Sequence, residues 1–204
     1  MPKKLLVMGD SNSGGLYNAL TGLQPPGQAG HPEGLLMSGW TVINEARGGE
    51  SSVSGVSRIT DVVANGPYDA ALVCYGAVDF LNEILNTPPG ANGMIAIPNM
   101  HAIFNALVAG GTPAGRIYLA EGVGCLLKID PAIPQTLIDS RRFRAGYFAL
   151  GHCLRTTLGQ KLSYSMPQDD RYWNTYDCIH LTSLGYEVLA HRVINYLRAD
   201  GLNI

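Results

Sequence analysis

The chain has 204 residues, of which 46% are hydrophobic and 15% charged, and its formal net charge is −2. This composition predicts a single globular domain over residues 1–204 and excludes a disordered chain. There is no basic block and no apolar run of about 18 residues, so we expect neither a nucleic-acid partner nor a membrane span.

Short apolar runs alternate with longer segments of helical periodicity along the whole chain. The predicted strands are residues 5–8, 40–44, 69–75, 116–120 and 161–165. The predicted helices are residues 16–23, 52–64, 79–85, 94–109, 136–158 and 183–199. This alternation predicts an α/β fold, a three-layer α/β/α sandwich around a mostly parallel five-stranded sheet of flavodoxin-like type. Sites in such sheets form beyond the carboxyl ends of the strands.

The first predicted strand ends in the motif Gly9-Asp10-Ser11. Gly9 permits a tight turn, and Asp10, Ser11 or Ser13 is a suitable cap for a following helix. A serine at a helix N-terminus lies where backbone N–H groups favour negative charge, so Ser11 is a candidate nucleophile. The same motif also fits an ordinary helix cap without a catalytic role.

Glycine-containing turns follow the second and third predicted strands as well. Gly48-Gly49 allows the backbone to turn sharply and direct an N–H group into a cleft. Ser52 then caps a predicted helix, and Asp79, after Gly76, caps the next one. The helix of residues 52–64 is expected to bury one apolar face, made of Val53, Val56, Ile59, Val62 and Val63.

Asp177 and His180 lie three residues apart, just before the last predicted helix. Residues at this spacing share a face, so the acid can hold one imidazole nitrogen and leave the other for Ser11. That arrangement is the logic of a serine–histidine–acid triad. The alternative for this pair alone is a helix cap beside a surface histidine.

Taken together, the motifs resemble the SGNH (GDSL-like) hydrolase family over nearly the whole chain. The resemblance implies an acyl-enzyme on Ser11, with His180 as base and Asp177 as orienting acid. It also implies an oxyanion hole made by the backbone N–H groups of Ser11 and Gly49. Four blocks carry it, in the family's order: Gly9-Asp10-Ser11; Val42-Ile43-Asn44 with Gly48-Gly49-Glu50-Ser51; Gly76-Ala77-Val78-Asp79; and Asp177-Cys178-Ile179-His180-Leu181-Thr182 with Gly185-Tyr186.

One block departs from the family pattern. The third block has Val78 where the family has an asparagine, and valine cannot donate a hydrogen bond to an oxyanion. Losing one such donor costs about 3 kcal/mol in comparable hydrolases. We hypothesise that the side chain of Asn82 or Asn12 replaces it; alternatively, Val78 shapes an acyl pocket.

The predicted function is a serine esterase that acts on an acetylated carbohydrate or a short-chain acyl ester. Two alternatives stay open: an acyltransferase with the same triad, and a non-catalytic carbohydrate-binding module on a decayed hydrolase scaffold. Aromatic side chains, Tyr17 among them, would suit a sugar ring but also fit a core or lid role. The residues predicted to contact substrate are Asp10, Val78, Phe80, Trp173 and Tyr176.

The remaining expectations concern cofactors and location. The four cysteines are dispersed, which indicates reduced thiols, and no clustered ligands indicate a metal, so we expect no cofactor. The apolar run at residues 5–8 is too short for a signal-peptide core, so we expect a cytoplasmic protein whose partner is a small-molecule or glycan ester. The sequence leaves the oligomeric state open.

Overall fold

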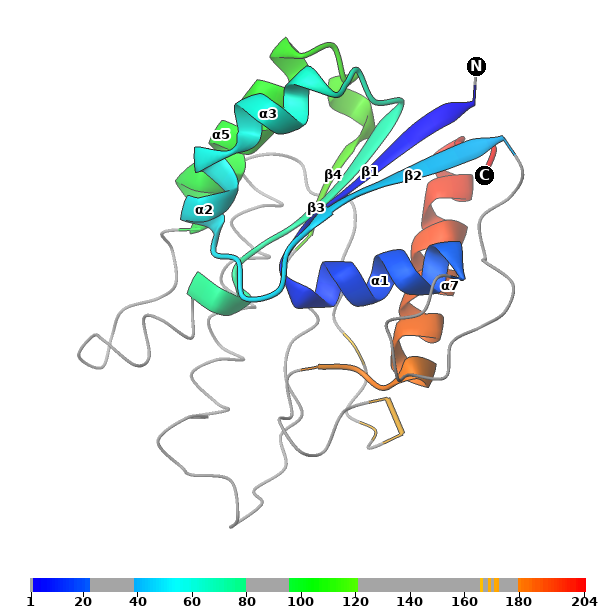
Figure 1. Cartoon of the computed structure of the whole chain (residues 1–204). Helices are drawn as coiled ribbons and strands as arrows, with labels where there is room; N and C mark the ends of the chain where they lie inside the picture. Colours follow the sequence, from blue (N-terminus) through cyan, green and yellow to red (C-terminus); the bar gives the residue numbers. More distant parts are fainter. Residues whose placement is uncertain are drawn as a thin grey trace, which may run out of the picture.

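Parallel strands form a sheet at the centre of the molecule (Figure 1). The computed structural model describes residues 2–22, 39–79, 96–120, 166, 169, 171–172 and 180–204. Within these residues the sheet has four strands in the order β2-β1-β3-β4. Their bounds are Lys3–Gly9 for β1, Trp40–Ala46 for β2, Ala70–Cys74 for β3 and Ile117–Ala120 for β4.

Burial follows strand position in this sheet. Every residue of β3 is buried, and so are the last five of β1, whereas β2 is only partly covered, as suits a strand at the edge. Gly9 pairs with Ala46 on one side and with Cys74 on the other, so β1, β2 and β3 end level with one another. The segments that follow these three strands therefore leave the sheet along one edge.

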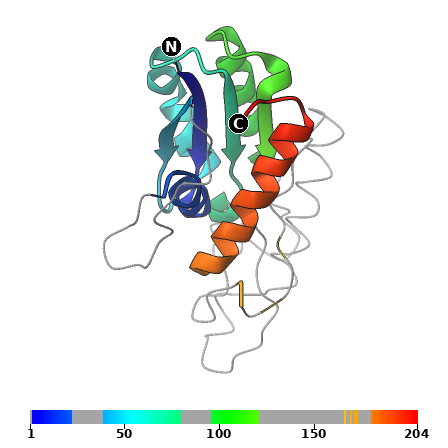
Figure 2. The ribbon, with the colours of Figure 1, turned by 90° about the vertical axis from the view of Figure 1, so that its right-hand side faces the viewer.

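Helices cover both faces of the sheet (Figures 1 and 2). α1 (Ser11–Thr21) and α7 (Ser183–Ala199) pack on one face, where Leu5 and Val7 of β1 point. α2 (Ser52–Ser57), α3 (Ile59–Ala64) and α5 (Ala96–Ala109) pack on the other face. The alternation of side chains along each strand thus supplies two separate cores, and the predicted three-layer α/β/α sandwich is confirmed.

The predicted strands near residues 5–8, 40–44, 69–75 and 116–120 are all present, and α7 has the predicted bounds. Its N-cap is Thr182, whose side chain accepts a hydrogen bond from the N–H of Gly185. Pro98 lies in the first turn of α5, where no intrahelical N–H is needed. The predicted fifth strand at 161–165 and the predicted helix at 136–158 lie outside the described residues.

The prediction of one continuous helix over residues 52–64 is wrong. Two helices, α2 and α3, meet at Arg58, whose backbone has φ −112° and ψ 3°. Ser57 Oγ donates to the carbonyl of Ser54, so a side chain competes for a carbonyl near the break. The cap of α2 is Ser51 rather than Ser52. Val53 is 52% exposed and does not join the predicted apolar face, because α2 packs through the small residues Ser52 and Gly55.

α1 begins at Ser11 with Asp10 as its cap, as the Gly9-Asp10-Ser11 motif predicts, and five residues before the start at residue 16 that the apolar pattern predicts. Gly14 and Gly15 disfavour a helix locally, but tertiary packing overrides that preference. A Cβ at Gly15 would lie 2.3 Å from the ring of Tyr186, so the glycine lets α7 approach α1 closely. This close approach affects the candidate site, because α1 begins with Ser11 and α7 follows His180.

Candidate active site

Ser11 is the first residue of α1, directly beyond the carboxyl end of β1. Asp10 is the N-cap, and its Oδ1 accepts a hydrogen bond of 2.9 Å from the N–H of Asn12. The backbone N–H of Ser11 belongs to the first turn, whose amides have no partner within the helix. The side chain of Ser11 is partly exposed. Ser11 therefore sits at the positive end of the α1 dipole and is open to a ligand.

His180 lies against Ser11 although 169 residues separate them in the sequence. Ser11 Oγ is 2.7 Å from Nε2 of His180, which is hydrogen-bond distance. His180 precedes Leu181 and the cap residue Thr182, so the start of α7 determines where the imidazole lies. A hydroxyl and an imidazole in this contact are the two groups that a serine nucleophile and its general base require.

The contact between α1 and α7 determines the position of this pair. The Tyr186 ring packs against Gly15, and its hydroxyl donates to Oδ1 of Asn12 over 2.9 Å. On the far side of the cap, the N–H of Thr182 donates to the carbonyl of Tyr172 over 2.9 Å. Asn12 is 1% exposed, and its side-chain oxygen is engaged with α7. This contact favours a structural role for Asn12 over the hypothesised role as oxyanion donor.

Gly49 lies in a tight turn that follows β2. The N–H of Glu50 donates to the carbonyl of Arg47, and Gly49 has φ +73°, which only glycine adopts easily. The N–H of Arg47 donates to the carbonyl of Gly9 over 2.9 Å, so the turn is tied to the end of β1. The turn therefore begins within one hydrogen bond of the Gly9-Asp10-Ser11 segment.

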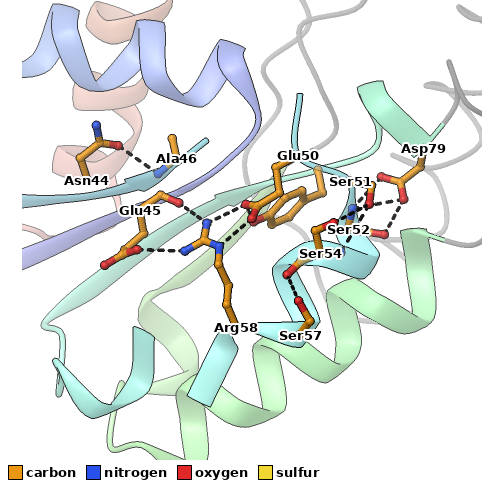
Figure 3. A network of polar contacts seen from close by, with 11 residues as sticks. Asn44, Glu45, Ala46, Glu50, Ser51, Ser52, Ser54, Ser57, Arg58 and Asp79 are labelled. Atoms are coloured by element: carbon orange, nitrogen blue, oxygen red, sulfur yellow. Dashed lines mark hydrogen bonds and ion pairs between the residues drawn. The ribbon is translucent and has the colours of Figure 1, made fainter. Parts of the chain in front are cut away.

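A buried ionic cluster fixes the far end of this turn (Figure 3). Glu50 faces Arg58 through two bonds of 2.6 Å, one from Nε and one from Nη2, and its Oε2 also accepts from the hydroxyl of Tyr75 over 2.6 Å. Arg58 binds Oε2 of Glu45 over 2.9 Å and donates to the carbonyl of Glu45. Burial raises the pKa of the Tyr75 hydroxyl, so it stays a donor to the carboxylate.

Asp79 joins the next turn to the same segment (Figure 3). Its carboxylate accepts from the N–H of Ser52 at 3.0 and 3.2 Å and from Ser52 Oγ at 2.7 Å. Asn99 of α5 donates to Ser52 Oγ over 2.9 Å. The predicted role of Asp79 as N-cap of the following helix is wrong, because residues 77–79 are already helical. The observed role is different, because Asp79 binds the first turn of α2.

The carboxyl of Asp10, next to Ser11 in the chain, has a pKa that burial shifts. It is 1% exposed, and its Oδ2 has no hydrogen-bond partner within the described residues. Burial raises the pKa of Asp10 from 3.8 to about 6, while the bonds from the N–H groups of Asn12 and Ser13 and the nearby His180 oppose the rise and Asp79 adds to it. Because protein covers this carboxyl, Asp10 influences Ser11 by capping the helix that Ser11 begins.

This pKa predicts a pH-dependent stability that Asp10→Asn removes. Between pH 4 and pH 6 the native carboxyl holds a proton that the unfolded chain releases, so the free energy of unfolding falls as pH rises, by about 3 kcal/mol in total. Asparagine preserves the cap but does not titrate. We expect Asp10→Asn to gain about 3 kcal/mol over the wild type between pH 4 and pH 7 in urea unfolding. Asp61→Asn, at an exposed carboxylate, should show no such gain; equal curves for all three proteins would contradict the prediction.

Of the other predicted site residues, Val78 lies within the described part of the chain and five lie outside it. Val78 is partly buried in the short helical turn after Gly76, beside Asp79, and brings no polar group to that turn. Sequence reasoning missed the cluster of Glu50, Arg58 and Tyr75, because no local pattern joins them. The predicted residues that lie outside the described part of the chain are Asp177, Asn82, Phe80, Trp173 and Tyr176.

No group of three His, Cys, Asp or Glu side chains within the described residues could hold a metal ion. None of the helices among these residues is long and apolar enough to cross a membrane.

Solved structures with a similar fold extend over nearly the whole chain. A carbohydrate acetylesterase family member from Sinorhizobium meliloti has a TM-score of 0.70 at 17% identity, covering 98% of this chain and 100% of its own. An inhibitor-bound aryl esterase of M. smegmatis has a TM-score of 0.65 at 14% identity over 97% and 99% of the two chains. A lipase/acylhydrolase from Enterococcus faecalis has a TM-score of 0.59 at 14% identity over 98% and 96%.

Sequence comparisons give no such matches. No protein-family model matches the chain, and no curated protein matches it significantly. The structural likeness at these low identities establishes the fold that the chain shares with these esterases and acylhydrolases.

Proposed function

We propose that this chain, which has the fold of the SGNH hydrolases, is a serine esterase with Ser11 as its nucleophile. The observation that carries the proposal is the 2.7 Å contact between Ser11 Oγ and His180 Nε2 at the N-terminus of α1. A serine that only capped the helix would need no imidazole against its hydroxyl. The contact instead provides a nucleophile with a base in position to take its proton.

The reaction would proceed in two steps. Ser11 Oγ attacks the ester carbonyl carbon while His180 takes the hydroxyl proton, and the imidazolium then donates that proton to the departing alcohol. Water attacks the acyl-enzyme with His180 again as base, and Ser11 is regenerated with release of the acid. On the spacing of the last block, Asp177 is proposed as the acid that orients the imidazole.

Backbone amides would stabilise the negative oxygen of each tetrahedral intermediate. The N–H of Ser11 lies in the first turn of α1, where the helix dipole favours negative charge. The Gly49 turn is hydrogen-bonded to the end of β1, which supports a second donor close to the first. Val78 leaves an apolar side chain at the position of the family's third donor, so we expect a site that depends mainly on these two amides.

An acetyl or other short acyl ester is the proposed substrate class. The similar fold of the Sinorhizobium meliloti acetylesterase supports an acylated carbohydrate, and the apolar Val78 suits a small acyl group. No described feature favours acyl transfer over hydrolysis.

A fluorophosphonate probe tests the proposal directly, because it reacts with activated serines and not with ordinary ones. We expect one covalent adduct per chain, located on the peptide that contains Ser11, together with loss of nitrophenyl acetate turnover. Prior unfolding in urea should abolish labelling, since His180 then no longer lies against Ser11. Absence of labelling in the folded chain would favour the non-catalytic binding module.

A further inference from the structure

We infer that Glu50 is a positioning residue for ester hydrolysis, held by Arg58 and Tyr75 so that the turn before it presents the N–H of Gly49 to the reacting oxygen. The inference rests on the proposed function and extends it to side chains that touch no substrate. It explains why the charged side chain directly after Gly49 is buried, at 8% exposure, against Tyr75, which belongs to the core under α2, α3 and α5.

The contacts of Glu50 come from two separate parts of the fold, the junction of α2 and α3 and the segment after β3. Arg58, at the junction of α2 and α3, binds both carboxylate oxygens and also reaches Glu45 of β2. Tyr75, directly after β3, donates to Oε2 and is fully buried. A carboxylate that accepts three bonds from two such partners cannot change rotamer without losing several charge-assisted bonds. The backbone beside it is therefore restrained as well.

Gly49 is the residue that needs such restraint. A Cβ placed on it would meet nothing within 4 Å among the described residues, so packing against them does not hold the residue in place. Its turn is fixed instead by what precedes and follows it. The bond between Arg47 and Gly9 holds the start, Glu50 holds the end, and the bonds from Ser52 to Asp79 hold the next residues. Oxyanion stabilisation depends on donors that are already in place when charge develops.

The chain contains a matched control for this cluster. Tyr118 is also buried and donates to a carboxylate, Oδ2 of Asp200, over 2.6 Å, and Arg116 lies 3.6 Å from the same oxygen. Asp200 caps the C-terminal end of α7, about 25 Å along the helix from the end that follows His180. Tyr75→Phe and Tyr118→Phe thus remove the same kind of bond, but only the first lies next to the Gly49 turn.

The test compares nitrophenyl acetate with its thiono analogue, in which sulfur replaces the carbonyl oxygen. A well-placed N–H favours the oxygen ester, because the larger sulfur fits the hole poorly. We expect Tyr75→Phe to lower kcat on nitrophenyl acetate about tenfold with KM within twofold. The ratio of turnover on the oxygen ester to turnover on the thiono ester should also fall. Glu50→Gln should lower kcat about 100-fold. Tyr118→Phe should leave both quantities at the wild-type values.

The outcomes separate this inference from the proposed function. Suppose that wild-type turnover depends on Ser11, but that Tyr75→Phe is as active and as selective for the oxygen ester as Tyr118→Phe. That result would overturn the inference alone and reduce the cluster to a stability role. A wild-type chain without Ser11-dependent turnover would overturn the proposed function and the inference with it. Tyr75→Phe is the primary variant because it leaves the Glu50–Arg58 ion pair intact.

Discussion

Ser11→Ala is expected to reduce nitrophenyl acetate turnover by roughly 10⁴-fold or more while leaving the fold unchanged. The change removes the hydroxyl that lies 2.7 Å from His180 Nε2, and with it the covalent step. The cap of α1 is Asp10, so the helix keeps its N-terminal hydrogen bond in the variant. Steady-state kinetics measure the loss of turnover, and circular dichroism with urea unfolding shows whether the fold is retained.

Ser13→Ala is the matched control for this experiment. Ser13 lies two residues further along α1, is 1% exposed, and its Oγ has no hydrogen-bond partner within the described residues. Replacing it removes a hydroxyl from the same helix without breaking a bond there. We expect wild-type kcat for Ser13→Ala. If Ser11→Ala retained more than a tenth of the wild-type rate, Ser11 would not be the nucleophile.

The central strands of the sheet could be predicted because they consist of continuous apolar runs in the sequence. Leu5 to Met8 and Ala70 to Cys74 are buried on both faces, and such runs predict strands without any tertiary information. The cap residue Asp10 predicted the start of α1, whereas the apolar pattern placed it at residue 16, because Gly14 and Gly15 act against a helix until Tyr186 of α7 packs on Gly15. The break between α2 and α3 was missed because a side-chain hydroxyl competes for a carbonyl, which hydrophobic periodicity does not register.

Some residues of the candidate site could likewise be predicted from the sequence, and others could not. Residue types at the strand ends predicted Ser11 and Gly49 as functional residues, and the spacing of Asp177 and His180 before the last helix predicted His180. The structure brings Ser11 and His180 into contact. Their distance depends on the packing of α1 against α7, which no local pattern contains. Glu50, Arg58 and Tyr75 were not predicted, because residues 8 and 25 positions apart meet only after the sheet has formed. The predicted role of Asp177 stays a prediction.

Gly9→Ala should have the largest effect on stability among single-methyl changes in the described sheet. Gly9 is the last residue of β1 and has φ +151°, where a side chain is strained. A Cβ there would lie 2.1 Å from the carbonyl oxygen of Cys74 and 2.3 Å from Ser13 Oγ. The first neighbour is backbone of the paired strand β3, so relief requires the strands to separate. We expect the free energy of unfolding to fall by about 3–5 kcal/mol.

Two further glycines separate contact from conformation in this prediction. Gly48→Ala places a methyl group where no described residue lies within 4 Å, without a positive φ, so its stability should equal that of the wild type. Gly49→Ala meets the same open space but at φ +73°, which should cost about 1–2 kcal/mol. Urea unfolding of the three variants should therefore give losses in the order Gly9, Gly49, Gly48. A loss for Gly9→Ala no larger than that for Gly49→Ala would mean that β1 and β3 adjust to the methyl group, and that the strand end beside Ser11 is less rigid than the hydrogen-bonded register indicates.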